Sequence, residues 1–204
     1  MRTAKLSDSA NNPSYLDLSL SSFFKLVSGG EPAPAGGSVA AVTVGLAASL
    51  CAKAARLSTK QMPDASTIAV AAELFRDRAG SLCEADARGY SFVISALRQP
   101  RTHDPKIRRQ AITEALSLAS NVPVEIVEVS AGVADLAARI AENGNQNLLG
   151  DAVTAALLAE SSARSAAALV WINLEGMPND ERLSRVAMLL ENVVENSARA
   201  RRHF

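Results

Sequence analysis

Apolar residues recur along this chain at steps of three and four from Tyr15 onward, which is the period of one face of an α-helix. Prolines and glycines divide this pattern into segments, because proline removes a backbone donor and glycine permits the left-handed exit from a helix. The pattern predicts helices over residues 15–27, 38–57, 64–98, 104–121, 123–141, 148–174 and 180–200. We therefore expect an all-α, single-domain helical bundle over residues 1–204, with a loose N-terminus over residues 1–13.

Several helix ends carry clear signals. The loop Pro32-Ala33-Pro34-Ala35-Gly36-Gly37-Ser38 cannot be helical until its end, and Ser38 is a suitable N-cap for the alanine-rich helix that follows. Asp104-Pro105 is a good helix start, with a capping carboxylate before a proline at the first helical position. The helix that begins at Asp104-Pro105 is expected to kink or break at Pro123.

Composition narrows the class of protein. The chain has 204 residues, and its 21 Lys and Arg balance 21 Asp and Glu, so no net charge draws it to nucleic acid or anionic lipid. The hydrophobic fraction is 48% and rich in alanine, while aromatic residues make up 4%, which favours closely packed helices over an all-β sandwich. No window holds about 20 uninterrupted apolar residues, and no leader pattern opens the chain. We expect a cytoplasmic protein with no nucleic-acid or membrane partner.

The two cysteines do not indicate a metal site. Cys51 and Cys83 are too few and too far apart for a zinc site or a disulfide scaffold. We expect buried, reduced thiols and no bound metal.

Asp86 is the least expected residue of the chain. It falls in the stripe of residues 64–98 whose other members are apolar or amphipathic, namely Ile68, Ala72, Phe75, Ala79, Leu82, Tyr90, Val93 and Leu97. Burying an ionised carboxylate without partners costs several kcal/mol, so Asp86 must be paired, protonated or open to a wet cavity. A structural ion pair with an arginine of another helix and a functional carboxylate are equally open interpretations.

Two other segments carry candidate chemistry. Gly36-Gly37-Ser38 exposes backbone N–H groups at the positive end of a helix and lets a ligand approach closely, although tight helix packing also needs glycine. Asn143-Gly144-Asn145-Gln146-Asn147, followed by Asp151, gathers amides and a carboxylate at a helix start. A capping turn accounts for part of this cluster, and ligand contact is the alternative for the rest.

At these places the sequence resembles the cyclodeaminase/cyclohydrolase family of one-carbon folate enzymes. The family includes the C-terminal domain of formiminotransferase-cyclodeaminase and stand-alone bacterial methenyltetrahydrofolate cyclohydrolases. The resemblance extends from about Tyr15 to the C-terminus. The matching residues, in the family's order, are Pro32-Ala33-Pro34-Ala35-Gly36-Gly37-Ser38, Glu84-Ala85-Asp86-Ala87 with Tyr90 and Pro100, Val122-Pro123, Gly144-Asn145-Gln146-Asn147 with Asp151, and Ile172-Asn173-Leu174.

The resemblance implies an all-helical homodimer that binds a tetrahydrofolate derivative in a cleft near the subunit interface and uses no metal or organic cofactor. The implied reactions are closure of 5-formiminotetrahydrofolate to 5,10-methenyltetrahydrofolate with loss of ammonia, and interconversion of the methenyl form with 10-formyltetrahydrofolate. Asp86 is the implied catalytic carboxylate. The implied substrate-binding residues are Pro34, Gly36, Gly37, Ser38, Lys60, Tyr90, Asn145, Asn147, Asp151 and Asn173.

The sequence also departs from the family pattern. The family usually has three glycines where this chain has Ala35-Gly36-Gly37, and several basic residues where residues 58–62 contain only Lys60. A second interpretation therefore stays open, in which the chain is a non-catalytic helical relative that binds a folate-like ligand or a protein partner.

Overall fold

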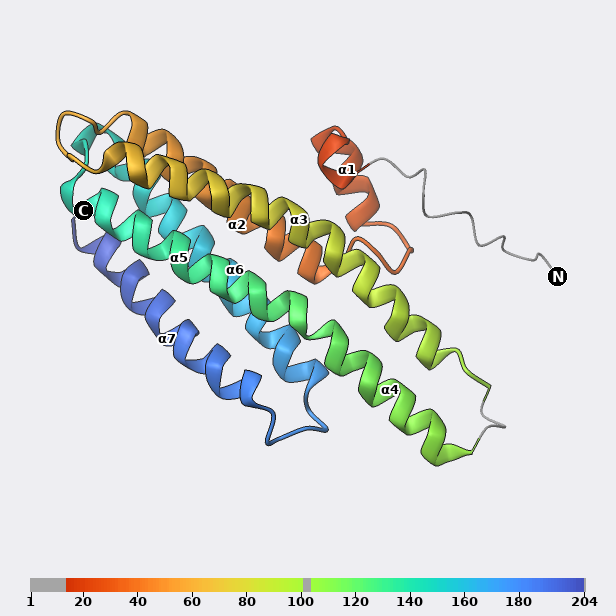
Figure 1. Cartoon of the computed structure of the whole chain (residues 1–204). Coiled ribbons are helices and arrows are strands. Elements are labelled where there is room, and N and C mark those ends of the chain that lie inside the picture. The colour runs from red at the N-terminus through yellow and green to blue at the C-terminus, as the bar shows by residue number, and fades with distance from the viewer. Residues whose placement is uncertain (1–13, 101–103, 204) are drawn as a thin grey trace.

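The computed structural model describes residues 14–100 and 104–203, and every regular element in these residues is helical (Figure 1). The expected loose terminus over residues 1–13 lies outside the described residues, and the expected all-α bundle is confirmed within them. The elements are η1 (Tyr15–Asp17), α1 (Leu20–Val27), α2 (Gly36–Arg56), α3 (Ala65–Leu97), α4 (Pro105–Ala119), α5 (Asn121–Asn143), η2 (Gln146–Leu148), α6 (Leu149–Asn173), α7 (Glu181–Ala200) and η3 (Arg201–His203).

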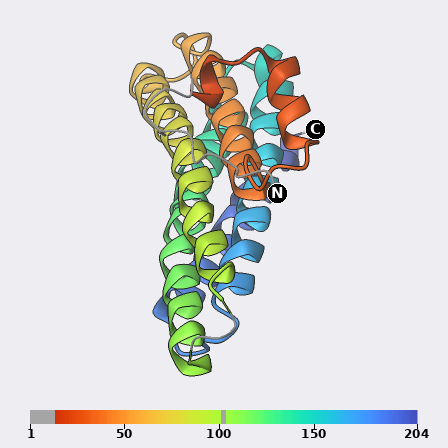
Figure 2. The same cartoon turned by 90° about the vertical axis from the view of Figure 1, so that its right-hand side faces the viewer.

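Helix α2 lies in the middle of the bundle. It packs against α3, α6 and α5, and α5 in turn packs against α6, α7 and α3 (Figure 1). The C-terminal part of α3 pairs with α4 in a hairpin, which a small apolar cluster of Val93, Ala96 and Ala115 holds together. Figure 2 shows this hairpin continuing below α1 and the loop that joins α1 to α2. The N-terminus of α2 therefore faces the middle of α3.

Small side chains allow the close packing of α2. Its buried positions are Gly37, Ser38, Ala40, Ala41, Val44, Ala47, Ala48, Cys51, Ala52, Ala54 and Ala55. By length and composition alone α2 could cross a membrane, since its most apolar 18-residue window has a mean hydropathy of 1.6. In the bundle 56% of that window is buried. The central position of α2 accounts for its apolar composition.

Substitutions of buried residues on α5 should greatly lower the stability of the protein. Ile126 is completely buried, so Ile126→Ala removes buried methyl groups and leaves a cavity. We expect the free energy of unfolding to fall by about 2–5 kcal/mol, measured by urea denaturation. Ile107→Ala on α4 is the control, because Ile107 is 61% exposed. An equal loss in both variants would contradict the assignment of Ile126 to the core.

The first predicted helix is divided in the structure. Residues 15–17 form η1, Leu18 and Ser19 are extended, and α1 begins at Leu20. The Ser19 hydroxyl accepts a hydrogen bond from Ser22 N at 3.2 Å and caps α1. The prediction of a single helix over residues 15–27 was therefore wrong. Serine side chains accept hydrogen bonds from backbone N–H groups here, in place of the carbonyl groups of a continuous helix.

Two further helix ends differ from the sequence prediction. Helix α2 starts at Gly36, and its N-cap residue is Ala35, which makes no side-chain capping bond. Ser38 lies within the helix, so the prediction of Ser38 as the N-cap was wrong. The break expected at Pro123 falls at Ser120, and Pro123 lies in the first turn of α5, where its missing donor costs no hydrogen bond.

Candidate active site

A pocket of about 190 Å³ lies where four segments of the bundle meet. The N-terminus of α2, the middle of α3, the junction of α4 and α5, and the C-terminal end of α6 each provide one wall. The lining residues are Ala35, Gly36, Gly37, Asp86, Gly89, Tyr90, Ala119, Val122, Pro123, Leu169 and Asn173. Asp86 is the one carboxylate among these lining residues, which makes it the candidate for acid–base chemistry in the pocket.

Asp86 is held in place by Ser38. The Ser38 Oγ lies 3.0 Å from Asp86 Oδ2 and 3.1 Å from the Cys83 carbonyl oxygen, and its hydroxyl donates toward these acceptors. Burial raises the pKa of Asp86 above its ordinary value, while hydrogen bonds from the side chain and backbone of Ser38 act in the opposite direction without cancelling the rise. The carboxyl group is therefore easier to protonate than an exposed aspartate.

The interpretation of Asp86 as half of a structural ion pair is not supported. None of the ion pairs between described residues includes Asp86. Its side chain is half-buried and faces the pocket. The sequence allowed Asp86 to be paired, protonated or open to a cavity, and in the structure its carboxyl group is partly buried and open to a cavity.

Gly37 allows Asp86 to approach the start of α2. A side-chain carbon built on Gly37 would overlap the carboxyl carbon and both oxygens of Asp86, so only glycine permits this arrangement. The first N–H groups of α2 have no acceptor within the helix, and the helix dipole favours negative charge beside them. The glycine loop therefore serves close packing and a polar site together.

Part of the sequence-predicted site is assembled in this pocket. Gly36, Gly37, Asp86, Tyr90 and Asn173 line it. Ser38 is buried behind the carboxylate that it binds. Pro34 is buried in the loop that leads to α2, where the Ala33–Pro34 peptide bond is cis.

The other predicted residues, Lys60, Asn145, Asn147 and Asp151, lie at the opposite end of α2. Asp151 pairs with Lys53 at 2.7 Å. At 1.5 Å per residue, Lys53 lies about 25 Å from Gly36 along the α2 axis. Lys60 lies beyond the C-terminus of α2 in an exposed turn. One subunit therefore does not bring these four residues to Asp86, and their expected role in substrate binding stays a prediction.

The polar groups of Asn145 form hydrogen bonds within the fold. Its backbone N–H donates to Ser58 Oγ at 2.9 Å, and its side-chain amide donates to the Leu57 carbonyl oxygen at 3.2 Å. Its side-chain oxygen accepts from Asn147 N at 3.0 Å and caps η2. The capping interpretation of this cluster therefore holds for Asn145, which also ties η2 to the turn after α2.

Comparison with known proteins identifies the family. A family model described as formiminotransferase-cyclodeaminase matches residues 19–191. The chain belongs to this family. Methenyltetrahydrofolate cyclohydrolase of Methylorubrum extorquens is 30% identical over 183 residues, which are 84% of this chain and 88% of that protein. Formimidoyltransferase-cyclodeaminase of Rattus norvegicus is 30% identical over 208 residues, and the chain spans 94% of its own length but only 38% of that relative.

A solved structure shares the fold. Formiminotetrahydrofolate cyclodeaminase from Thermotoga maritima superposes with a TM-score of 0.80 at 24% sequence identity, covering 92% of this chain and 96% of that one. The helical bundle of this chain is therefore also the fold of that solved cyclodeaminase. The match to the family model confirms the resemblance of the sequence to the family.

Part of the pocket wall in this member of the formiminotransferase-cyclodeaminase family was not predicted from the sequence. Gly89 lies one helical turn after Asp86 and could have been found from that spacing. Ala119 gave no signal, because it belongs to an ordinary apolar stretch of α4 and only tertiary packing places it at the pocket.

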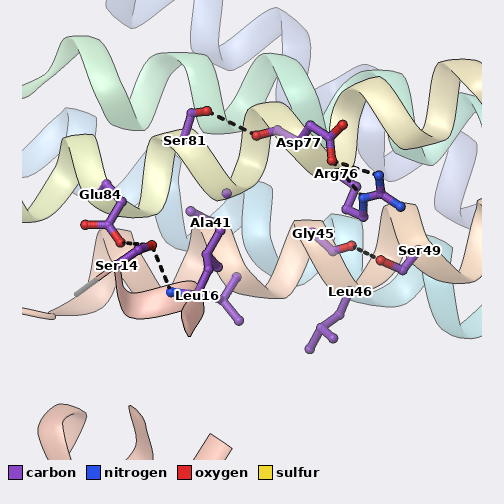
Figure 3. A pocket seen from close by; sticks show the side chains of 12 residues that line it. Ser14, Leu16, Ala41, Gly45, Leu46, Ser49, Arg76, Asp77, Ser81 and Glu84 are labelled. Carbon is purple, nitrogen blue, oxygen red and sulfur yellow. Dashed lines mark hydrogen bonds and ion pairs between the residues drawn. The ribbon is translucent and has the colours of Figure 1, made fainter. Parts of the chain in front are cut away.

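A second hollow, of about 530 Å³, lies between α2 and α3 beside η1 (Figure 3). Leu16 packs over Gly80, where an added side-chain carbon would come within 2.7 Å of Leu16 Cδ1. Arg76 pairs with Asp77 at 2.8 Å, and Glu84 accepts a hydrogen bond from Ser14 Oγ at 2.7 Å. With these charged groups paired, the hollow offers mainly apolar surface.

Both cysteines are buried and free, as expected. Burial raises the pKa of Cys51 to about 12 and that of Cys83 to about 11, so both remain thiols at neutral pH. Across residues 14–100 and 104–203, no group of three or more His, Cys, Asp and Glu side chains is arranged to hold a metal ion.

Proposed function

We propose that this chain is a one-carbon tetrahydrofolate enzyme that acts on the carbon–nitrogen bond of the N5/N10 bridge, as a formiminotetrahydrofolate cyclodeaminase or a methenyltetrahydrofolate cyclohydrolase. Family membership and the 88% coverage of a cyclohydrolase support this proposal. The structural observation that carries it is the Asp86 pocket, where a carboxyl group with a raised pKa faces a cavity beside the N-terminus of α2.

Both reactions pass through a cationic, amidinium-like carbon. In the cyclodeaminase reaction, N10 attacks the formimino carbon, the N10 proton passes to the amino nitrogen, and the bond from carbon to that nitrogen breaks to release ammonia. In the cyclohydrolase reaction, water adds to the methenyl carbon, the bond to N5 breaks and a proton is released. A carboxylate beside this carbon stabilises its charge, and the raised pKa lets Asp86 give a proton to departing ammonia or take one from attacking water.

We propose that the pterin lies between the start of α2 and the end of α6. Free N–H groups of Gly36 and Gly37 would donate to its carbonyl and ring acceptors, and the Asn173 side chain both donates and accepts. Tyr90, 40% exposed, offers its ring at the mouth of the pocket. This scheme assigns the charge and proton chemistry to Asp86 and requires no metal or organic cofactor.

We also propose a homodimer. Leu46 of α2 is 57% exposed and points away from α3 (Figure 3). Leu20 and Phe24 of α1 are also more than half exposed. Apolar surface of this kind is typical of a protein–protein interface. On this arrangement Lys60, Asn145, Asn147 and Asp151 would reach a substrate only from a second subunit. Light scattering of the purified protein tests the proposal, and a monomer mass at micromolar concentration would contradict it.

We also propose a cytoplasmic location with no nucleic-acid or membrane partner. The balanced charge of the chain supports the second part, because no net charge attracts it to nucleic acid or anionic lipid.

The decisive experiment follows the absorbance of the methenyl chromophore with each substrate. Its appearance from 5-formiminotetrahydrofolate, with release of ammonia, identifies a cyclodeaminase, and its loss to 10-formyltetrahydrofolate identifies a cyclohydrolase. Turnover of neither substrate would overturn the proposal and favour a non-catalytic relative. Thermal melting with 5-formyltetrahydrofolate then separates a folate binder from a protein without a folate site, because a ligand at a hundred times its Kd stabilises by about 2.7 kcal/mol.

A further inference from the structure

A second, larger pocket adjoins the Asp86 pocket. It has a volume of about 570 Å³ and lies between α3 and the segment that contains α1 and the proline-rich loop. Tyr90 lines both pockets. Pro32 and Ala33 line the larger pocket, and Ala35 and Gly36 of the same loop line the smaller one. A ligand seated at Asp86 can therefore extend past Tyr90 without leaving the surface of α3.

One face of α3 forms the floor of the larger pocket. Ala87, Ser91, Ile94 and Arg98 follow each other at helical steps of four, three and four residues along this face. The floor therefore combines the apolar side chains of Ala87 and Ile94 with the hydroxyl of Ser91, and it ends at the cation of Arg98. Arg98 is the one cation among the residues that line this pocket, and its side chain is exposed.

The spacing from Asp86 to Arg98 suits the tail of a reduced folate. The two residues lie about 18 Å apart along the axis of α3. An extended p-aminobenzoylglutamate spans roughly 12 Å from N10 to its terminal carboxylate when built from bonds of about 1.3–1.5 Å. Helical side chains tilt toward the N-terminus of their helix, so the long side chain of Arg98 can reach back toward Tyr90 and cover the difference.

We propose that this larger pocket is the subsite for the p-aminobenzoylglutamate tail and that Arg98 binds a tail carboxylate. This inference rests on the proposed function and adds the residue that selects folates with a glutamate tail. The benzoyl ring would pack on Ile94 and the ring of Tyr90, and the guanidinium of Arg98 would donate two hydrogen bonds to one carboxylate.

The acidic residue of the pocket stands on the opposite wall. Glu31 lies in the loop before Pro32, whereas Arg98 lies near the end of α3. Repulsion by Glu31 disfavours a carboxylate on the loop side, and attraction by Arg98 favours it on the α3 side. The two charges together give the tail one direction, along α3 and away from Asp86.

The test compares Arg98→Gln with the parent protein on two substrates, the natural tetrahydrofolate substrate and its tetrahydropteroate analogue, which lacks the glutamate. With the glutamate present, we expect KM to rise about tenfold in the variant while kcat stays within twofold. With the analogue, we expect parent and variant to have the same KM. Salt should raise the KM of the parent for the full substrate more than that of the variant, because screening weakens an exposed ion pair.

Arg88→Gln is the matched control, since Arg88 is an exposed arginine of the same helix that does not line this pocket. Its KM for both substrates should equal that of the parent. An unchanged KM in Arg98→Gln, or an equal rise with the analogue, would overturn the tail subsite while leaving the proposed function intact. Absence of turnover by the parent protein would overturn the proposed function and this inference with it.

Discussion

Asp86→Asn should lower kcat by two to four orders of magnitude while leaving the protein folded. Asparagine keeps the shape and the acceptor oxygen that binds Ser38, but it carries no charge and exchanges no proton. Loss of a general acid–base group commonly costs this much. The rate of change of the methenyl chromophore measures the loss, and Asp77→Asn is the control because Asp77 is an exposed carboxylate of the same helix. Retention of the parental rate by Asp86→Asn would contradict the assignment.

Stability should respond to the same substitution with the opposite sign. Because the folded state raises the pKa of Asp86, the unfolded chain ionises first as pH increases. The parent therefore loses stability between the ordinary value of 3.8 and the raised value in the folded protein, and the loss persists at higher pH. Asp86→Asn removes this loss, so at neutral pH it should be at least as stable as the parent. Urea titrations at pH 3 and pH 7 check the sign, and a variant that is less stable only at pH 7 would contradict it.

The fold was largely predictable because its signals are local. Helical periodicity and the breakers after Val27, Arg56 and Asn143 placed most of the helices within a few residues of where they lie. The errors occurred where a side chain had two possible partners. Ser38 is a good N-cap by type, but the Asp86 carboxyl group and the Cys83 carbonyl oxygen are its acceptors in the folded protein.

The site was only partly predictable because it depends on which helix ends meet. The sequence marks Asp86 by its place in an apolar stripe and Gly37 by its place before a helix, yet nothing local shows that these two residues touch. Asp151 matched the family motif equally well, but the length of α2 places it far from Asp86 in the same subunit. Motif matches therefore identified candidate residues, and tertiary packing decided which of them share a pocket.

Gly37→Ala should remove most of the activity, because the added methyl group would collide with the side chain of Asp86. The new methyl group would occupy the space of the Asp86 carboxyl group, so that group must turn away and lose its bonds to Ser38. We expect kcat to fall about a hundredfold or more, because a displaced acid–base group no longer reaches the reacting atoms. We also expect a loss of about 1–3 kcal/mol in the free energy of unfolding, which the helix preference for alanine offsets only in part.

Two other glycines of α2 separate this contact from the general effect of alanine. A side-chain carbon on Gly36 meets nothing within 4 Å, so Gly36→Ala should be at least as stable as the parent. A carbon on Gly45 makes only an ordinary contact of 3.5 Å with Ala79, and Gly45 lies outside the Asp86 pocket, so Gly45→Ala should keep the parental kcat. If Gly37→Ala instead matched Gly45→Ala in rate and stability, the carboxyl group of Asp86 would not depend on the open space at Gly37, and the geometry assigned to the pocket would be wrong.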